Sequence, residues 1–407
     1  MLPWLPLHGG TLPVYEKGNV MAEAYIVDAV RTPGGRARKG GLVDVHPADL
    51  GATVLDALVG RTGIDPQAIE DVILGCVTQA GEQAFAFGRN CVLASTLPET
   101  TPAVTIDRQC GSSQQALQFA AQAVMSGTQD VVIAAGAESM TRVPMGSNWQ
   151  LHQQNGIGIG PWPPSIQRRF GVKQFSQFHG AQAIADKYGF TREAMDAFAL
   201  ESHRKAAAAI DSGAFEAEIV PVDTGNGMVE TDEGVRRGGT MEKMGEIPPI
   251  SEGGSITAAN ASQMTDGASG VLVVSEQALR DHDLTPLARL HHFSVSAGDP
   301  VIMLEEPIPA TRKALAKSGM ALDDIDLFEV NEAFASVPMA WLQVMDADPA
   351  KLNVNGGAIA LGHPLGATGT KLMATLIHAL KARGGRYGLQ TMCEGGGIAN
   401  VTIVEAL

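Results

Sequence analysis

The chain has 407 residues, of which 45% are hydrophobic and 18% charged, a composition typical of a globular protein rather than a disordered one. Its 29 basic and 44 acidic residues give a formal charge of −15, which argues against a general nucleic-acid or anionic-membrane binder. No apolar stretch approaches the roughly 20 residues that span a bilayer. At this length we expect two or three domains, or two fused halves.

The first twenty residues contain three prolines and no basic region ahead of an apolar core, so they are not typical of a signal peptide. We expect residues 1–20 to form a disordered leader. The four cysteines are widely spaced and form neither a disulfide framework nor a Cys-x-x-Cys motif. This spacing favours reduced thiols in a cytoplasmic protein.

Strands and helices alternate along the first 140 residues. Apolar runs predict strands at 24–33, 71–77, 103–106 and 130–140, and helical spacing predicts helices at 48–59 and 112–126. Such alternation is typical of an α/β protein with a largely buried sheet.

The pattern then becomes irregular. Residues 141–178 and 223–254 are polar, rich in glycine and weakly periodic, which favours functional loops. A helix at 192–212 and a strand at 218–222 are predicted between them, and a strand at 269–276 follows.

The α/β alternation resumes from residue 287. Helices are predicted at 309–318 and 369–381, a strand leading into a helix at 326–335, and final strands at 387–397 and 400–407. In each half a strand is followed by a glycine-containing turn with a reactive side chain and then by an amphipathic helix. This similarity suggests an internal duplication.

Two of these turns carry residues suited to catalysis. Cys110 opens a helix, where the dipole favours a thiolate, and Ser112 or Ser113 could cap that helix. The alternative is a small buried residue. His363 lies in a glycine-rich run before Pro364 and could act as a base or an oxyanion donor. The alternative is a loop histidine with satisfied hydrogen bonds.

A third segment, Cys-Glu-Gly-Gly-Gly, begins at Cys393. A turn of this kind can present backbone N–H groups to an oxyanion, and a second thiol beside it could act as acid and base.

Together these segments resemble the thiolases. The resemblance extends from about Ala24 to Leu407, and the motifs that carry it are DRQCGSSQQAL, DEGVRRGGTMEK, ITAANASQMTDGAS, EVNEAFA, NVNGGAIALGHPLGATG and CEGGGIAN. It implies an α/β thiolase fold of two similar halves in a five-layered αβαβα arrangement. Residues 21–140, completed by 255–285, would form the first half and 286–407 the second. Residues 141–254 would form an inserted loop domain that binds coenzyme A (CoA).

The resemblance also implies catalytic roles. Cys110 would be the nucleophile that takes the acyl group, and His363 would remove its proton and help bind a thioester oxygen. Cys393 would exchange a proton with the α-carbon of acetyl-CoA. Asn331 would hold a water in one oxyanion hole, and the N–H groups of Cys110 and Gly395 would form the other.

Other residues are implied in substrate binding. Arg236 matches a residue near the adenine nucleotide of CoA and Ser262 one near the pantetheine, while Ala333 and Phe334 match residues that line the pantetheine tunnel. One departure is His179, at a position where the family commonly has methionine. It is expected near the acyl path and could alter acyl preference.

The implied activity is reversible CoA-dependent cleavage of 3-ketoacyl-CoA into acyl-CoA and acetyl-CoA, without a metal or prosthetic group. The segment LGCVTQAGEQ favours a degradative role. The alternatives are an acetyltransferase that forms acetoacetyl-CoA and a non-catalytic acyl-CoA-binding relative. A ketoacyl synthase is disfavoured, because such enzymes have histidine where this chain has Cys393. A homodimer or homotetramer is expected.

Overall fold

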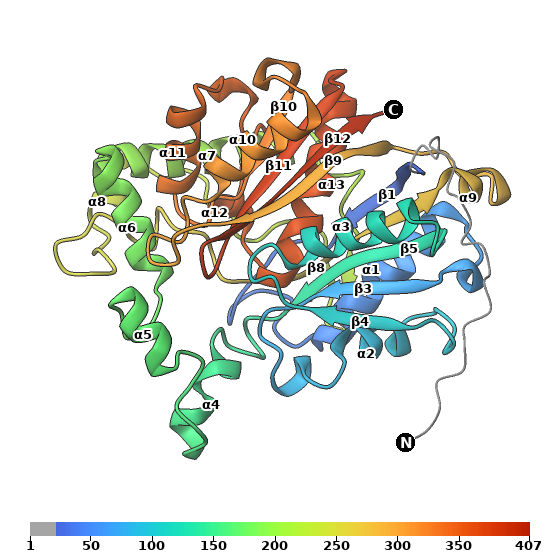
Figure 1. Cartoon of the computed structure of the whole chain (residues 1–407), viewed down its shortest axis with the longest axis horizontal. Helices are drawn as coiled ribbons and strands as arrows, with labels where there is room; N and C mark the ends of the chain where they lie inside the picture. Colours follow the sequence, from blue (N-terminus) through green and yellow to red (C-terminus); the bar gives the residue numbers. More distant parts are fainter. Residues whose placement is uncertain (1–21) are drawn as a thin grey trace, which may run out of the picture.

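One twisted sheet runs through the computed structural model, which describes residues 22–407 (Figure 1). The leader predicted at residues 1–20 lies outside the described residues. The strand order is β10-β11-β12-β9-β1-β8-β5-β3-β4, and β2 (Gly35–Arg36) pairs with β8. The bounds are β1 Ala24–Arg31, β3 Asp71–Gly75, β4 Ala103–Ile106, β5 Val131–Glu138, β8 Thr265–Ser275, β9 Ala288–Ala297, β10 Leu327–Val330, β11 Tyr387–Glu394 and β12 Ile398–Ala406.

The sheet consists of two halves with the same topology. The order β1-β8-β5-β3-β4 in the first half matches β9-β12-β11-β10 in the second, where Leu352 adds a parallel bridge at the place of β4. In both halves the first three strands are antiparallel and the next ones parallel. Within the sheet, the halves are joined where Tyr25 and Ile26 of β1 pair with Arg289 and Ala288 of β9. This repeat agrees with an internal duplication.

Helices complete the five layers, and the expected αβαβα fold is confirmed. On the outer face of the first half lie α1 (Pro47–Thr62) and α2 (Phe87–Ala94), and on that of the second lie α10 (Pro307–Ser318) and α11 (Ser336–Met345). The central layer is formed by α3 (Ser112–Met125) and α13 (Thr368–Arg383), whose apolar side chains share one core. In residues 22–407 we find no helix that combines the length and apolar character needed to cross a membrane.

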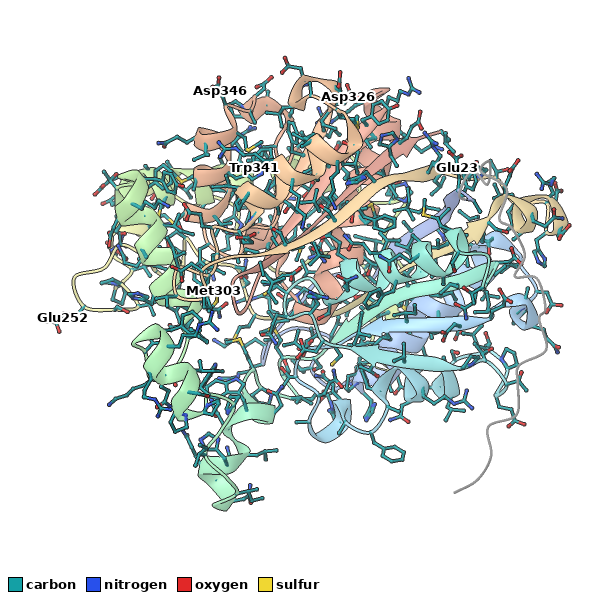
Figure 2. The ribbon with its side chains drawn as sticks, viewed as in Figure 1. Glu23, Glu252, Met303, Asp326, Trp341 and Asp346 are labelled. Carbon is teal, nitrogen blue, oxygen red and sulfur yellow. The ribbon has the colours of Figure 1, made fainter. Side chains whose placement is uncertain are left out.

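The outer core of the second half is built around Trp341 (Figure 2). Its ring packs against Phe328 of β10, and its Nε1 donates to Thr311 Oγ1 of α10 at 2.9 Å. The buried indole thus retains a hydrogen bond, and α10, α11 and the sheet are joined by one side chain.

Between β5 and β8 the chain forms a largely helical segment. Its elements are α4 Ser147–Asn155, α5 Pro164–Phe170, α6 Gln177–Tyr188, α7 Arg192–Asp211, β6 Val222–Asp223, β7 Met228–Val229 and α8 Met241–Gly245. The prediction of irregular structure at 141–178 is therefore wrong for α4 and α5. Edge-to-face contacts of Trp162 with Trp149 and Phe175 support these short helices, although neither helix has a fully buried face. The boundaries 141–254 of the loop domain stay a prediction.

A buried ion network ties this segment to β1. The guanidinium group of Arg31 is fully buried and donates two hydrogen bonds to Asp232, at 2.8 and 2.9 Å. Its Nε donates to Glu218 at 2.6 Å, and Asp232 also accepts from the Gly34 N–H. Because an unpaired buried charge is costly, each carboxylate constrains the path of the loop that carries it.

We predict that Asp232→Ala lowers the free energy of unfolding by about 3 kcal/mol or more, because it leaves the Arg31 charge buried with one partner fewer. The matched control is Asp211→Ala, which breaks an exposed pair with Arg237 and should cost less than about 1 kcal/mol. Urea unfolding measures both variants. Equal midpoints for the two would contradict the structural role of the network.

Candidate active site

Cys110 lies in a tight turn directly before α3. Gln109, the preceding residue, has a φ of 49°, a conformation that is strained for a side chain of this size. Gly111 takes the N-cap position of α3 and offers no side-chain cap. The strained turn thus holds the thiol at the beginning of the central helix layer.

The serines after Cys110 do not cap the helix, contrary to expectation. Ser112 is the first helical residue, and its Oγ accepts from the Arg108 N–H at 2.9 Å and donates to the Gln109 carbonyl at 2.6 Å. Ser113 Oγ accepts from the Thr370 N–H at 3.0 Å, in the first turn of α13. One serine therefore closes the cysteine turn, and the other links the two central helices.

The predicted stabilisation of the Cys110 thiolate is wrong for this structure. The side chain is 8% exposed and packs in an apolar cluster with Leu365 and Met392. Burial, followed by the nearby Glu394 carboxyl, raises the pKa of Cys110 to about 12. Loss of hydration favours the neutral thiol, so the thiol needs a base.

His363 has the tautomer that a base requires. It follows the short helix α12 (Ala358–Leu361), and its Nδ1 lies 2.6 Å from Thr368 Oγ1. The Thr368 hydroxyl donates its proton to the Pro364 carbonyl at 2.8 Å, so it accepts from His363 Nδ1–H. The proton is therefore on Nδ1, and Nε2 carries the free electron pair.

The imidazole is also kept neutral. It is 4% exposed, and burial, followed by the charge of Lys371, lowers the pKa of His363 to about 3. Nε2 is buried and has no hydrogen-bond partner in the structure. A buried unpartnered acceptor is uncommon and indicates a group that binds there.

Cys393 and Gly395 lie at the hairpin between β11 and β12. Cys393 is fully buried, and burial, followed by the proximity of Cys110, raises its thiol pKa well above the usual value. A Cβ on Gly395 would lie 2.8 Å from Oε1 of Gln109, the residue before Cys110. The hairpin is thus packed against the cysteine turn, and two protonated thiols share one site.

Asn331 supplies a second unsatisfied group. It follows β10 and is fixed by its N–H, which donates to the Thr391 carbonyl of β11 at 3.1 Å. Its side chain is 1% exposed, yet neither amide atom has a hydrogen-bond partner. Such an amide is suited to hold a water or a substrate oxygen.

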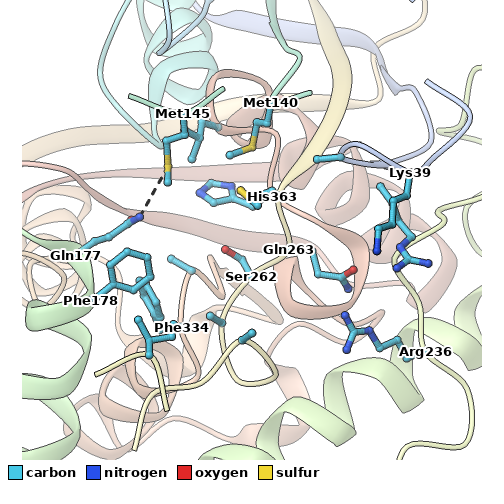
Figure 3. Close-up of a pocket in the computed structure, with 18 residues that line it drawn as sticks. Lys39, Met140, Met145, Gln177, Phe178, Arg236, Ser262, Gln263, Phe334 and His363 are labelled. Atoms are coloured by element: carbon cyan, nitrogen blue, oxygen red, sulfur yellow. Dashed lines mark hydrogen bonds between the residues drawn. The ribbon is translucent and has the colours of Figure 1, made fainter. Parts of the chain in front are cut away.

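A cavity of about 400 Å³ opens at His363 (Figure 3). His363 lies in the cavity wall, between an end with basic residues and an end with apolar residues. Lys39 and Arg236 lie at one end, and Met145, Phe178 and Phe334 at the other. The Phe178 and Phe334 rings meet edge to face, with centroids 5.6 Å apart. The cavity can therefore take a ligand with an anionic end and an apolar end.

The cavity wall includes the predicted residues Arg236, Ser262, Ala333, Phe334 and His363. The Ser262 N–H donates to the Ala333 carbonyl at 2.9 Å, which joins the two motifs that carry them.

The catalytic cysteines, Asn331 and Gly395 lie outside this wall. Cys110 is connected to the cavity through Met140 and Leu365, which belong both to its apolar cluster and to the cavity wall.

His179 does not line the cavity. Its side chain is exposed in the first turn of α6, and its neighbours Gln177 and Phe178 form the wall instead. Sequence reasoning missed both, as well as Arg36 and Lys39. The cluster of basic residues in GRARKGG was the available signal for the last two.

We predict that Thr368→Val slows alkylation of Cys110 by iodoacetamide roughly tenfold, because valine no longer holds the His363 proton on Nδ1. Thr368→Ser keeps the hydroxyl and should react like the unmodified protein. Peptide mass spectrometry of Cys110 over time measures the rates. Equal rates for the valine variant and the unmodified protein would show that Thr368 does not control the base.

Comparisons with known proteins agree with this geometry. The family model described as "Thiolase, N-terminal domain" matches residues 24–277, and "Thiolase, C-terminal domain" matches 284–406. The chain is 55% identical over 393 residues to the steroid 3-ketoacyl-CoA thiolase FadA6 of Mycobacterium tuberculosis, covering 96% of each. It is 44% identical over 393 residues to the acetyl-CoA acetyltransferase of Thiocystis violacea, covering 94% of this chain and 98% of the relative. The structure of human mitochondrial 3-ketoacyl-CoA thiolase in complex with CoA superposes with a TM-score of 0.84 at 35% identity, covering 95% and 98%. The chain belongs to the thiolase family of acyltransferases.

Proposed function

We propose that this protein cleaves 3-ketoacyl-CoA with CoA, giving acetyl-CoA and an acyl-CoA shortened by two carbons, through an acyl group on Cys110. The observation that carries the proposal is the neutral His363, whose buried Nε2 is free and lies in the wall of a cavity that reaches the apolar cluster of Cys110 through Met140 and Leu365. Thiolysis needs a base for the nucleophile and a second group that donates a proton in the first step and accepts one in the second. His363 and Cys393 are suited to these two roles.

In the first step, His363 Nε2 takes the Cys110 proton, and the thiolate attacks the 3-keto carbon. The bond between the α- and β-carbons breaks, the acyl group remains on sulfur, and Cys393 protonates the acetyl-CoA carbanion. In the second step, CoA gives its thiol proton to Cys393, attacks the thioester and releases acyl-CoA, and Cys110 recovers its proton from His363. Asn331 would hold a water near the developing oxyanion.

The charge distribution supports CoA as the substrate carrier. Arg36, Lys39 and Arg236 line the cavity, the last two at one end, and within residues 22–407 none of the three forms an ion pair. Unpaired cations in a chain of charge −15 are suited to the phosphates of CoA. The pantetheine arm would then extend past Ser262 towards His363.

The apolar end supports a bulky acyl group. Met145, Phe178 and Phe334 border it, and methionine side chains adapt to irregular shapes. The 55% identity to a protein named as a steroid 3-ketoacyl-CoA thiolase points to the same class. We therefore favour breakdown of large or ring-bearing acyl chains over formation of acetoacetyl-CoA.

The expected result is CoA-dependent loss of 3-ketoacyl-CoA, faster for bulky or ring-bearing substrates than for acetoacetyl-CoA. Cys110→Ala should abolish turnover, because it removes the acyl acceptor. Mass spectrometry of the intact protein without CoA should detect an acyl adduct on Cys110.

Turnover of acetoacetyl-CoA alone would favour the short-chain acetyltransferase instead. No turnover of any substrate, with normal CoA binding, would favour a non-catalytic acyl-CoA-binding protein.

We further propose that the protein is a homo-oligomer that pairs through β4. This strand is one of the two edges of the sheet, and its Val104 is 45% exposed. Exposed apolar side chains on the adjacent helices extend the surface, with Leu93 of α2 57% exposed and Phe119 of α3 38% exposed. An open apolar edge is a natural site for pairing with a second copy.

Light scattering should give at least twice the chain mass. Val104→Lys should lower the mass to that of one chain, because it places a charge in the pairing surface. As a control, Met228→Lys changes an exposed residue far along the chain, on β7. A monomeric unmodified protein would contradict the proposal.

A further inference from the structure

Lys371 is a buried cation in an unfavourable position. It is the fourth residue of α13 and only 3% exposed. A positive charge in the first turn of a helix opposes the helix dipole, and burial of an ammonium group costs further free energy. Both effects act against stability, which indicates that the residue serves another purpose.

The contacts of Lys371 are with the turn that carries His363. Its Nζ donates to the Leu361 carbonyl at 2.6 Å and to the Gly362 carbonyl at 3.0 Å. Leu361 is the last residue of α12, and Gly362, at a φ of 81°, leads directly into His363. The ammonium group therefore caps the C-terminal end of α12, where a cation is favourable, one residue before the base.

The same turn is confined from the opposite direction. A Cβ on Gly362 would lie 2.1 Å from Thr265 Oγ1, so the backbone packs tightly against β8. The His363 N–H donates to the Gln263 carbonyl at 3.0 Å and lies 3.2 Å from Thr265 Oγ1. Among the described residues, Lys371 is thus the one charged side chain that donates hydrogen bonds to the turn at Leu361 and Gly362.

Other charged groups surround Lys371 without pairing with it. Arg31 of β1, Glu218, Asp232 and Glu329 of β10 all act on its ammonium group electrostatically. Arg31 forms the ion pairs with Asp232 and with Glu218 Oε1, and within residues 22–407 Lys371 has no salt bridge of its own. Its donors are therefore directed to the turn. Its charge is also the second cause, after burial, that lowers the pKa of His363.

We propose that Lys371 is a positioning residue for His363, whose ammonium group holds the two carbonyls that fix where the imidazole lies. The inference rests on the proposed role of His363 as the base for Cys110. The positive charge also disfavours imidazolium, which keeps Nε2 available as an acceptor.

The test compares three substitutions of Lys371. Lys371→Met removes the charge and the donors, Lys371→Gln removes the charge but keeps an N–H donor, and Lys371→Arg keeps both. We expect kcat for thiolysis to fall roughly tenfold or more in the methionine variant, with KM for CoA within about twofold. Lys371→Arg should restore most of the rate.

The pH profile separates positioning from general stability. Without the Lys371 charge the pKa of His363 rises towards its ordinary value, so the imidazole is protonated at higher pH. The acid limb of kcat should therefore move to higher pH in the methionine and glutamine variants, and remain in place in the arginine variant. Lys381→Met, on the exposed end of the same helix, is the matched control and should change neither quantity.

Circular dichroism and thermal unfolding establish that each variant is folded. If the methionine variant does not fold, the inference is tested by whether the acid limb of kcat moves to higher pH in the glutamine variant. An unshifted acid limb and an unchanged kcat in a folded charge-removing variant would overturn the inference. If instead His363→Ala retains full activity, or the unmodified protein is inactive, the proposed function itself fails.

Discussion

The site depends on the contact between the first turns of α3 and α13. These helices lie side by side between the two halves of the sheet, and one follows Cys110 while the other follows His363 by five residues. A Cβ on Gly369 would come within 2.1 Å of the Gln114 N atom, so the two backbones can approach this closely only with glycine there. Displacement of one helix would separate the nucleophile from its base.

Burial then sets the proton positions in this site. It raises the thiol pKa of Cys110 and Cys393 and lowers the pKa of His363, so the resting state is neutral. A neutral pair costs less in an apolar cluster than a thiolate and an imidazolium would. The Cys110 thiol therefore needs a neighbouring base to form its thiolate.

Much of the fold and many of the site residues could be predicted from the sequence, because short local patterns indicate them. The strand at 103–106 and the helix that begins at Ser112 follow from short apolar patterns, and the structure has both at those residues. Cys110, His363 and Cys393 were found by the glycine-rich motifs around them. Gln177 and Phe178 were missed because their place in the cavity wall results from the packing of α6 against distant segments. The sign of the Cys110 pKa shift was missed for a similar reason, since burial is a property of the whole fold.

The matched topology of the two halves has a consequence for how this chemistry could arise. Cys110 and His363 precede equivalent helices in the two repeats, α3 and α13. Two identical half-chains assembled in the same way would present the same residue at both helix starts, either two thiols or two imidazoles. A nucleophile with a different partner requires the two repeats to differ in sequence, and joining them in one chain allows each to accept substitutions that the other does not share. The fused chain thus places two unlike residues at equivalent helix starts in a fixed ratio of one to one.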